Sequence, residues 1–447
     1  MSMENTLAFS RRQFLSVAGA SAAGTVLASP LQALYTRAAL GQSVNGRGYG
    51  PLVKDPKGLL DLPEGFQYQT FSRTGQVMTD GRPVPGAHDG MATFAGPGNT
   101  TILVRNHELS PDASLGVTGQ KYDPSCKGGT TTLIVGPDRK LIKDFASLAG
   151  TYRNCAGGRT PWGSWISCEE NTSAPGVDPN VTKRHGFNFE VPSKAKGPVA
   201  PEPLVAMGRF NHEAVAVDPK TGIVYQTEDR GDSLFYRFIP KQRGNLKAGG
   251  VLEALKIKNK PQAMTKTKFP VGQPLPVEWV RIENVNPATD STPEGTATPE
   301  SVRAQGFAEG AAQFSRGEGA WFGKNEVYFC CTDGGEAELG QVWRYVPGRS
   351  PQQGGTIELF VEPNNRRILD SPDNIVVAPF GDLFLCEDGD GQQFIRGVNP
   401  NGTLYTFARN ALNESEFAGA CFSPDGKTMF VNIQDPGITL AIWGSWV

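Results

Sequence analysis

Short apolar segments separated by polar turns dominate the chain after residue 50. They are rich in aromatic and β-branched residues and are bounded by Gly, Pro, Asn or Asp, which is typical of strands that end in tight turns. The clearest lie at residues 101–104, 131–135, 163–167, 233–239 and 341–346. No stretch from residue 50 onward shows a sustained helical period. The pattern therefore predicts an all-β fold.

Four stretches share one layout, in which an acidic residue precedes a β-hairpin and another acidic residue follows it. The acidic ends are Glu213 and Glu228-Asp229, Glu318 and Asp333, Asp373 and Glu387-Asp388, and Glu416 and Asp435. The tight turns lie at residues 218–222, 323–325, 379–382 and 423–427. A repeated hairpin with carboxylates at both ends predicts radially stacked blades whose acids gather at one mouth.

The spacing of these hairpins favours a β-propeller. A further strand of one type follows three of them, at residues 234–238, 342–345 and 394–398. A four-stranded blade takes roughly 40–50 residues, so residues 41–447 can form a single propeller domain, most simply with six blades and otherwise with five or seven. The alternative is a β-sandwich, whose strands also alternate at short spacing. Recurrence of the same three-strand unit favours the propeller.

The N-terminal 40 residues predict a targeting segment rather than part of the fold. Arg11 and Arg12 precede Phe14-Leu15 and a weakly apolar run over residues 16–34, which is typical of a twin-arginine signal peptide. We therefore expect the twin-arginine export machinery as a partner and a periplasmic or secreted protein. The alternative is a chance arginine pair before a buried helix. The apolar run is too short and too rich in Ala, Gly and Ser for a stable membrane span.

Composition narrows the classes of partner and of site. The net charge is −2, which favours neither nucleic acid nor anionic lipid as a partner, and we expect a monomer. The 45 acidic residues greatly outnumber the 4 histidines, so a site should be rich in oxygen. Seven cysteines, at 126, 155, 168, 330, 331, 386 and 421, form no CxxC pair. Their odd number leaves at least one free thiol or a metal ligand.

Polar clusters at the expected strand ends predict a metal centre. They are Asn106-His107-Glu108, Asn154-Cys155, Cys168-Glu169-Glu170 and Asn211-His212-Glu213. Single acids at strand ends are usually solvated, but like charges that meet at matched positions repel unless cations neutralise them. Calcium suits such an oxygen set. A thiolate from Cys155 would select a softer or more Lewis-acidic metal such as iron or zinc, and its alternative is a buried structural thiol.

The longest motif resembles a known family. Residues 154–165, Asn-Cys-Ala-Gly-Gly-Arg-Thr-Pro-Trp-Gly-Ser-Trp, followed by Cys168-Glu169-Glu170-Asn171, resemble the signature of PhoX-type alkaline phosphatases. The resemblance implies a six-bladed propeller with iron (Fe3+) and calcium at its centre and a phosphomonoesterase of the periplasm or exterior. It implies that Cys155 binds iron and that carboxylates complete the cluster. The expected metal ligands are Cys155, Glu108, Glu169, Glu170, Glu213, Glu228, Asp229, Glu318, Asp373, Glu387 and Asp388.

The same resemblance suggests how a phosphoester substrate is bound. Arg316-Gly317-Glu318 resembles the family's Arg-Pro-Glu-Asp segment, with Gly317 in place of Pro and Gly319 in place of Asp. It implies that Arg316 binds phosphate through its planar fork, and Arg396 is a candidate for the second cationic group. Metal ions would stabilise charge on the phosphoryl oxygens and activate water, so no Ser or Asp nucleophile is required. The alternative for Arg316 is an ion pair with Glu318.

Two other functions fit an acid-lined propeller. One is a calcium-dependent lactonase-type hydrolase, in which a thiolate at Cys155 would have no role. The other is a non-catalytic binding module that keeps calcium only for stability. The resemblance favours the metal-dependent phosphoester hydrolase over both.

Overall fold

The computed structural model describes residues 48–292 and 295–446, which lie in one compact unit of residues 47–446. The predicted signal peptide, residues 1–40, lies outside the described residues. Within the described ranges, no helix is both long enough and apolar enough to cross a membrane.

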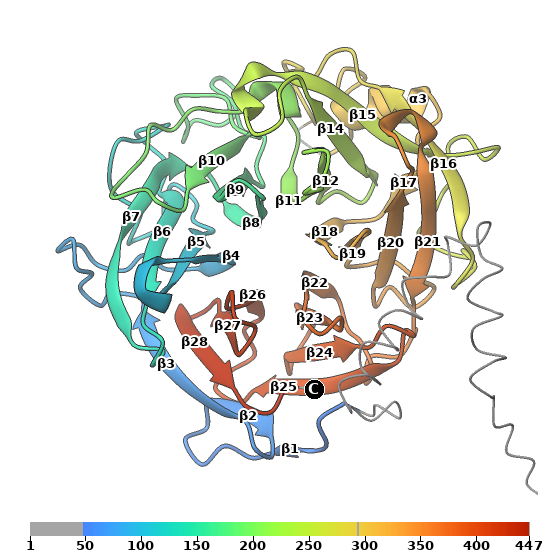
Figure 1. The fold of residues 1–447 in the computed structure, drawn as a ribbon. Helices are drawn as coiled ribbons and strands as arrows, with labels where there is room; N and C mark the ends of the chain where they lie inside the picture. Colours follow the sequence, from blue (N-terminus) through green and yellow to red (C-terminus); the bar gives the residue numbers. More distant parts are fainter. Residues whose placement is uncertain (1–47, 293–294, 447) are drawn as a thin grey trace, which may run out of the picture. The chain divides into compact units, whose positions relative to one another are not determined.

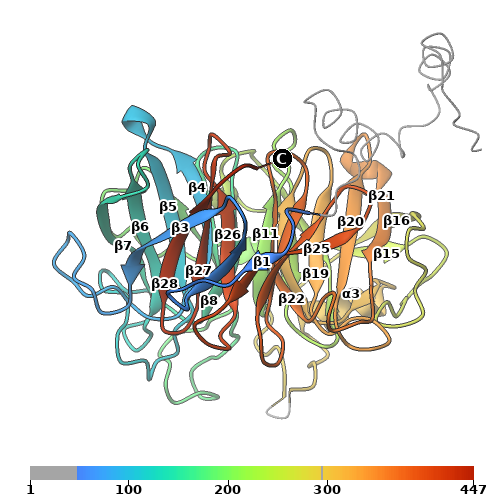
Figure 2. The same ribbon diagram turned by 90° about the horizontal axis from the view of Figure 1, so that it is seen from below.

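The unit is a β-propeller, in which antiparallel sheets surround a central axis (Figure 1) and stand side by side when the ring is seen edge-on (Figure 2). One sheet has the order β4 (His88–Ala95), β5 (Thr101–His107), β6 (Gly128–Val135), β7 (Leu141–Thr151). The next has the order β8 (Asn154–Arg159), β9 (Ser164–Glu169), β10 (Asn188–Pro192). The sandwich alternative is therefore wrong.

A nine-stranded sheet follows and joins two sets of strands. Its order is β11 (His212–Val217), β12 (Val224–Glu228), β14 (Tyr236–Pro240), β15 (Gly250–Ile257), β16 (Leu275–Arg281), β21 (Gly355–Val361), β20 (Gln341–Pro347), β19 (Val327–Cys331), β18 (Gly317–Phe322). The sets meet where β16 pairs with β21, through only Leu275↔Ile357 and Pro276↔Thr356. If the sheet is divided at this short junction, the ring has the six blades that we propose.

The remaining sheets complete the ring. One has the order β22 (Pro372–Val377), β23 (Leu383–Glu387), β24 (Phe394–Val398), β25 (Leu404–Asn410), β2 (Leu60–Pro63), β1 (Leu52–Val53). The last has the order β26 (Phe417–Phe422), β27 (Thr428–Ile433), β28 (Ile438–Trp443), β3 (Gln67–Arg73). Strands from the two ends of the unit therefore share this sheet: β28 pairs with β3 from Ile438↔Arg73 to Trp443↔Gln67.

Short elements occupy the connections. A two-stranded ribbon pairs β13 (Ser233–Leu234) with β17 (Gln313–Phe314), so the strand predicted at 233–239 is divided in two. One short α-helix, α3 (Val302–Ala308), begins after Ser301, whose side chain accepts a hydrogen bond from the amide of Ala304. The 3-10 turns are η1 (Pro97–Asn99), η2 (Val205–Met207), η3 (Leu246–Ala248) and η4 (Pro351–Gln353).

The four predicted hairpins are confirmed as β11–β12, β18–β19, β22–β23 and β26–β27. Each supplies the innermost two strands of its blade, and the strands nearest the axis in Figure 1 are β4, β8, β11, β18, β22 and β26. Their apolar side chains fill the space between neighbouring blades, as where Phe384 on β23 packs with Phe422 on β26 and Met429 on β27.

Glycines let these inner strands approach one another closely. A Cβ atom on Gly158 of β8 would lie 1.8 Å from the carbonyl oxygen of Val215 on β11, and one on Gly319 would lie 2.5 Å from that of Asp373. Both distances are far below a van der Waals contact. The narrow ring at the axis therefore requires residues without side chains at these positions.

Candidate metal centre

Every inner strand carries a β-bulge near its start. The register of pairing with the second strand shifts between His88 and Met91, Asn154 and Gly157, His212 and Val215, Gly317 and Ala320, Pro372 and Ile375, and Ala418 and Cys421. A bulge bends the strand and redirects a side chain. The first residues inside the six bulges are Asp89, Cys155, Glu213, Glu318, Asp373 and Gly419. The repeated bulge thus presents four carboxylates and one thiol at matched positions.

Side chains from neighbouring blades hold these bulges in place by donating hydrogen bonds to the backbone carbonyl groups of the bulged residues. Asn106 on β5 donates from Nδ2 to the carbonyl oxygens of Cys155, at 2.9 Å, and Ala156, at 2.5 Å. Its own Oδ1 accepts hydrogen bonds from Trp165 and Ser167. The bulge of β8 is therefore held by a buried network, which orients the Cys155 side chain.

Two further blades use the same device. Thr227 on β12 donates to the carbonyl oxygen of Glu318 at 2.5 Å, and Asn432 on β27 donates to that of Asp89 at 2.6 Å. Asn106 belongs to one of the polar clusters that the sequence predicts at the metal centre. The structure gives it a positioning role, because its side chain binds backbone carbonyl groups in the bulge of β8 and not the donor atoms.

A second set of polar residues follows the second strand of each blade. It consists of Glu108, Glu170, Asp229, Thr332, Asp388 and Gln434, each directly after the last residue of β5, β9, β12, β19, β23 or β27. Hydrogen bonds tie this set to the bulge set, since Gln434 donates to Asp89 Oδ2 at 3.1 Å and to Glu108 Oε2 at 2.9 Å.

At the end of three of these second strands lies a pair of adjacent acids whose two side chains point in different directions. In Glu169-Glu170, Glu228-Asp229 and Glu387-Asp388, the first residue ends its strand and its side chain turns into the blade. The second lies among acids of neighbouring blades, as the charges that shift the pKa values of Glu170, Asp229 and Asp388 show. Adjacent strand residues point to opposite sides, which accounts for the division.

The structure therefore does not place four of the predicted site residues among these acids at the axis. They are Glu169, Glu228, Glu387 and Arg396. Glu169 accepts from His185 Nδ1 at 2.7 Å, and Glu228 accepts from Tyr236 at 2.6 Å and Arg303 at 3.3 Å. Arg396 donates to Glu387 at 2.8 Å and to Thr406 at 2.6 Å, and its guanidinium lies over the Phe394 ring. These four side chains stabilise their blades. Arg396 is only 4% exposed and is bound within its own blade, so its geometry does not support the predicted catalytic role.

Five of the remaining predicted donors lie close together, and Glu108, Asp229 and Asp388 lie outside the two groups that they form. Two groups of three residues each bring their ligand atoms within 4.8 Å of one another. The first is Cys155, Glu170 and Glu213, and the second is Glu213, Glu318 and Asp373. Glu213 belongs to both groups, so they form one continuous donor set. We call it the central donor set. Asp373 is partly exposed and the other four are buried.

The carboxylates of the central donor set repel one another when they are ionised, and this adds to the effect of burial in raising their pKa values. Burial raises the pKa of Glu213, and the charges of Asp373 and Glu170 raise it further. Burial likewise raises the pKa of Glu318, as do Asp229 and Asp373. The pKa of the Cys155 thiol is raised by burial and by Glu213. So many buried acids in mutual contact can all ionise only when cations compensate them.

Two arginines flank the central donor set. Arg153 contacts Glu108 and Glu170, each at 2.7 Å, and it bridges two neighbouring blades. Arg316 binds Asp229 through two nitrogens, at 2.8 and 3.0 Å, and contacts Glu318 at 3.0 Å. The predicted pair with Glu318 is therefore present, together with a stronger one to Asp229. Both arginines have positive φ angles, 47° and 48°, and their side chains are 40% and 44% exposed.

Sequence reasoning did not include Asp89, Arg153 or Glu416 among the site residues. Burial raises the pKa of Asp89, and Glu108 and Asp373 raise it further. Burial also raises the pKa of Glu416, and the charges of Asp373 and Asp388 raise it further. Glu416 precedes one of the four repeated hairpins, as the sequence indicates, but Gly419 occupies the bulge position of that hairpin. Asp89 precedes the first strong strand signal, and only the bulge shows its equivalence to Glu213.

A separate cavity lies at the other end of the inner strands. It has a volume of about 260 Å³ and is lined by residues that include Val217, Trp321 and Phe322. Val217 and Phe322 end β11 and β18, whereas Glu213 and Glu318 lie near their starts. This cavity is thus distinct from the central donor set.

Comparisons with known proteins agree with this architecture. Residues 47–437 match the family model described as alkaline phosphatase PhoX. No match was found among curated protein sequences.

Similar solved structures include Pseudomonas fluorescens PhoX in complex with vanadate, a transition state analogue, with 18% identity, a TM-score of 0.68 and coverage of 89% of this chain and 98% of that chain. A gluconolactonase from Xanthomonas campestris has 10% identity, a TM-score of 0.45 and coverage of 88% and 98%. The virginiamycin B lyase from Staphylococcus aureus has 13% identity, a TM-score of 0.40 and coverage of 85% and 99%.

Proposed function

The chain belongs to the alkaline phosphatase PhoX family of phosphoric ester hydrolases, and we propose that it hydrolyses phosphate monoesters at an iron- and calcium-binding centre formed by the central donor set. The observation that carries the proposal is a buried thiol, Cys155, within 4.8 Å of the carboxylates of Glu170 and Glu213. The family relationship supports the class of reaction.

The residues present fit these metals. Calcium takes six to eight oxygen ligands, and Glu213, Glu318 and Asp373 offer carboxylates within 4.8 Å of one another. A thiolate beside carboxylates suits iron better than calcium. We therefore propose Cys155, Glu170 and Glu213 as iron ligands and Glu213, Glu318 and Asp373 as ligands shared with calcium, with Glu108, Asp229 and Asp388 nearby. When bound, such metals supply Lewis acidity and an activated water.

The two arginines bind the phosphoryl group in this proposal. Each keeps a partly exposed guanidinium beside the donor set, and its carboxylate partners hold it there in a fixed orientation. A planar guanidinium matches phosphate oxygens with two parallel hydrogen bonds. Because Arg153 and Arg316 come from separate blades, they can hold the phosphoryl group from two sides and neutralise the charge that grows on its oxygens.

Replacement of Cys155 tests the proposal. We expect Cys155→Ser to lose bound iron and to reduce turnover of p-nitrophenyl phosphate at least about 100-fold, since a metal ion contributes several kcal/mol to transition-state stabilisation. Cys421→Ser is the matched control, because Cys421 is also buried on an inner strand but lies outside the central donor set. Normal iron content and turnover in Cys155→Ser would refute the assignment. Vanadate should inhibit the wild-type enzyme, and EGTA should remove calcium together with activity.

We also propose that residues 1–40 direct export through the twin-arginine machinery to the periplasm or the exterior. The support is the Arg11-Arg12 pair before a weakly apolar run. Replacing both arginines with lysine should leave the protein in the cytoplasmic fraction. Unchanged export of that variant would disprove the assignment.

A further inference from the structure

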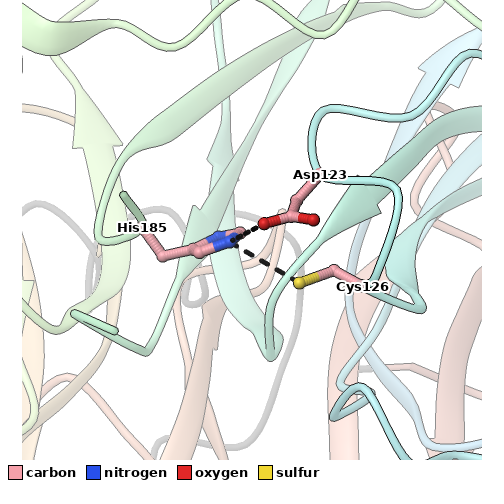
Figure 3. Close-up of side chains that lie close together, drawn as sticks. All are labelled: Asp123, Cys126 and His185. Atoms are coloured by element: carbon pink, nitrogen blue, oxygen red, sulfur yellow. Dashed lines mark hydrogen bonds and ion pairs between the residues drawn. The ribbon is translucent and has the colours of Figure 1, made fainter. Parts of the chain in front are cut away.

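A second group of metal-ligand side chains lies away from the central donor set. Asp123 and Cys126 come from the connection between β5 and β6, and His185 comes from the connection between β9 and β10. Figure 3 shows the three side chains pointing toward one another across the two connections. All three are fully buried. We call this group the loop cluster.

Hydrogen bonding accounts poorly for the position of His185 Nε2. This nitrogen lies 3.5 Å from Cys126 Sγ and 3.3 Å from Asp123 Oδ2. It carries at most one proton, so it can donate to only one of these two atoms. The distance to the carboxylate oxygen is also longer than the roughly 2.7–2.9 Å of charge-assisted hydrogen bonds.

The same distances agree with coordination of a zinc ion. Zinc binds histidine nitrogen at about 2.0–2.1 Å, thiolate sulfur at about 2.3 Å and carboxylate oxygen at about 2.0–2.2 Å, usually in a tetrahedron. Around such an ion, ligand nitrogen and sulfur are about 3.5 Å apart, and nitrogen and oxygen are about 3.3–3.5 Å apart. The observed 3.5 and 3.3 Å are close to these values.

The surroundings orient the ligands as they do in known metal sites. Metal-binding histidines almost always donate their other ring nitrogen to a carboxylate or carbonyl group, and His185 Nδ1 lies 2.7 Å from Glu169 Oε1. Backbone amides of Tyr152, Gly186 and Phe187 in turn hold Glu169. Asp123 is fixed by amides of Ser125, Thr182 and Lys183.

We propose that Asp123, Cys126 and His185 bind a zinc ion with a structural role, at a site separate from the central donor set. With three protein ligands, the fourth tetrahedral position falls to a water molecule, a ligand set more usual at catalytic than at structural zinc sites; here the three ligands are fully buried in two connections. The ion joins the connections of two neighbouring blades. Through Glu169 it also stabilises the end of β9, and therefore the position of Glu170, the next residue in the chain and a member of the central donor set.

A proton is the competing occupant. Burial lowers the pKa of His185, but the Glu169 carboxylate raises it to about 11, so without a metal His185 is a cation between two acids. Zinc binding then displaces one proton from His185 and one from Cys126, and both are released to solvent. Metal content distinguishes the two occupants.

The experiment uses the full chain in a Cys155→Ser background, which removes the thiol of the central donor set. After chelation and desalting, the protein is titrated with Co(II), whose tetrahedral thiolate complexes absorb visible and near-ultraviolet light. Zinc is then added and its stoichiometry measured by elemental analysis. We expect one cobalt ion with a thiolate charge-transfer band, its displacement by one zinc ion, and a rise in melting temperature.

Further variants separate the loop cluster from other thiols. Cys126→Ser should abolish the charge-transfer band and weaken zinc binding at least about 100-fold, and Glu169→Gln should weaken it roughly 10–100-fold. Cys330→Ser is the control, because Cys330 is a buried thiol outside any donor group within the described residues. An absence of the band, or zinc binding unchanged by Cys126→Ser, would overturn the proposal.

The test remains decisive if the Cys126→Ser variant fails to fold, and it does not depend on the proposed phosphatase activity. If Cys126→Ser does not fold, the titration of the Cys155→Ser protein still decides, since failure to bind zinc there excludes the site. The readouts are metal content, absorbance and melting temperature, so they do not depend on the phosphatase reaction. A protein without phosphatase activity can still bind this zinc, and an active one can lack it.

Discussion

At the scale of single residues, the acids at the axis make the protein depend on its ions. Asp89, Glu213, Glu318 and Asp373 are all acids whose pKa is raised, with burial as the leading cause. Without metal these groups hold protons at a pH at which the unfolded chain has released them. The metal-free protein should therefore respond to pH in the opposite direction to a typical salt-bridged protein.

We predict that the chelated protein loses stability as the pH rises from about 4.5 to about 7. The pKa of both Glu228 and Glu387 is raised from 4.5 to about 7 by burial, against the opposing effect of their arginine partners. The folded state binds more protons than the unfolded state within this range, so stability is full below about pH 4.5 and falls as the pH rises through about 7. Thermal unfolding of EGTA-treated protein measures the effect.

Glu228→Gln in the chelated protein should reduce this pH dependence, because an amide cannot titrate. A melting temperature that climbs over the same range would contradict the assignment of raised pKa values. The metal-loaded protein should show a flatter profile, because bound cations keep the central acids ionised and leave Glu228 and Glu387 to titrate.

The arginines at the rim give a second prediction at this scale. Arg153→Lys and Arg316→Lys keep the charge but lose the planar fork, so each should reduce kcat/KM for p-nitrophenyl phosphate about 10- to 100-fold, the equivalent of one charge-assisted hydrogen bond of roughly 1.5–3 kcal/mol. Metal content should change little. Arg243→Lys is the control, because Arg243 is exposed and donates to the carbonyl oxygen of Pro219 on the far turn. Equal activity in all three variants would argue against phosphate binding by the arginines.

At the scale of elements, the repeated bulge determines which side chains reach the axis. Its effect depends on close packing of the inner strands, and Gly158 provides the sharpest case. We predict that Gly158→Ala lowers the free energy of unfolding by about 1–3 kcal/mol, because the new Cβ would lie 1.8 Å from the carbonyl oxygen of Val215. The displacement of β8 should also weaken iron binding at Cys155. Chemical denaturation and elemental analysis measure both effects.

Gly197→Ala is the matched control for Gly158→Ala. A Cβ at Gly197 meets no atom within 4 Å, so stability should change by less than about 0.5 kcal/mol. Similar losses in the two variants would show that the close approach of β8 and β11 is easily relieved.

Sequence patterns anticipated the hairpins but not their register. The hairpins β11–β12 and β22–β23 could be predicted because their tight turns and apolar strands leave a compositional signal. A bulge adds only one residue to one strand and leaves no such signal, so Asp89 was not recognised as an equivalent of Glu213. For the same reason the sequence could not decide between Glu169 and Glu170, although only Glu170 joins the central donor set.

Arg153 and Arg396 show the limits of reasoning from motifs. Arg396 is the sequence's candidate for the second cationic group, but in the structure it donates to Glu387 and Thr406 of its own blade. The sequence does not identify Arg153, which directly precedes the most recognisable motif of the chain, because its contacts with Glu108 and Glu170 join residues far apart in sequence. Such long-range pairs depend on the order of blades around the ring.

At the scale of the whole molecule, the last sheet joins the two ends of the unit. Strand β28 pairs with β3 on one side and with β27 on the other. We predict that deletion of residues 438–447 abolishes cooperative unfolding and leads to aggregation, since it exposes the edges of both β27 and β3. Calorimetry and size-exclusion chromatography measure the outcome.

A chain that begins at residue 47 is the control for this deletion. It removes a longer segment but keeps all of the compact unit, so its melting temperature should match that of the full-length protein. Cooperative unfolding of the chain that ends at residue 437 would show that the ring is stable without its final strand.

The pairing of β28 with β3 also orders events during biosynthesis. Synthesis reaches β3 long before β28, so a growing chain that has not yet reached Trp443 cannot contain the closed ring. Until then the acids of the inner strands are present without the closed ring around them. Stable binding of metal at the proposed centre should therefore follow the completion of β28, and before that the cell must keep an open chain with exposed strand edges from misassembling.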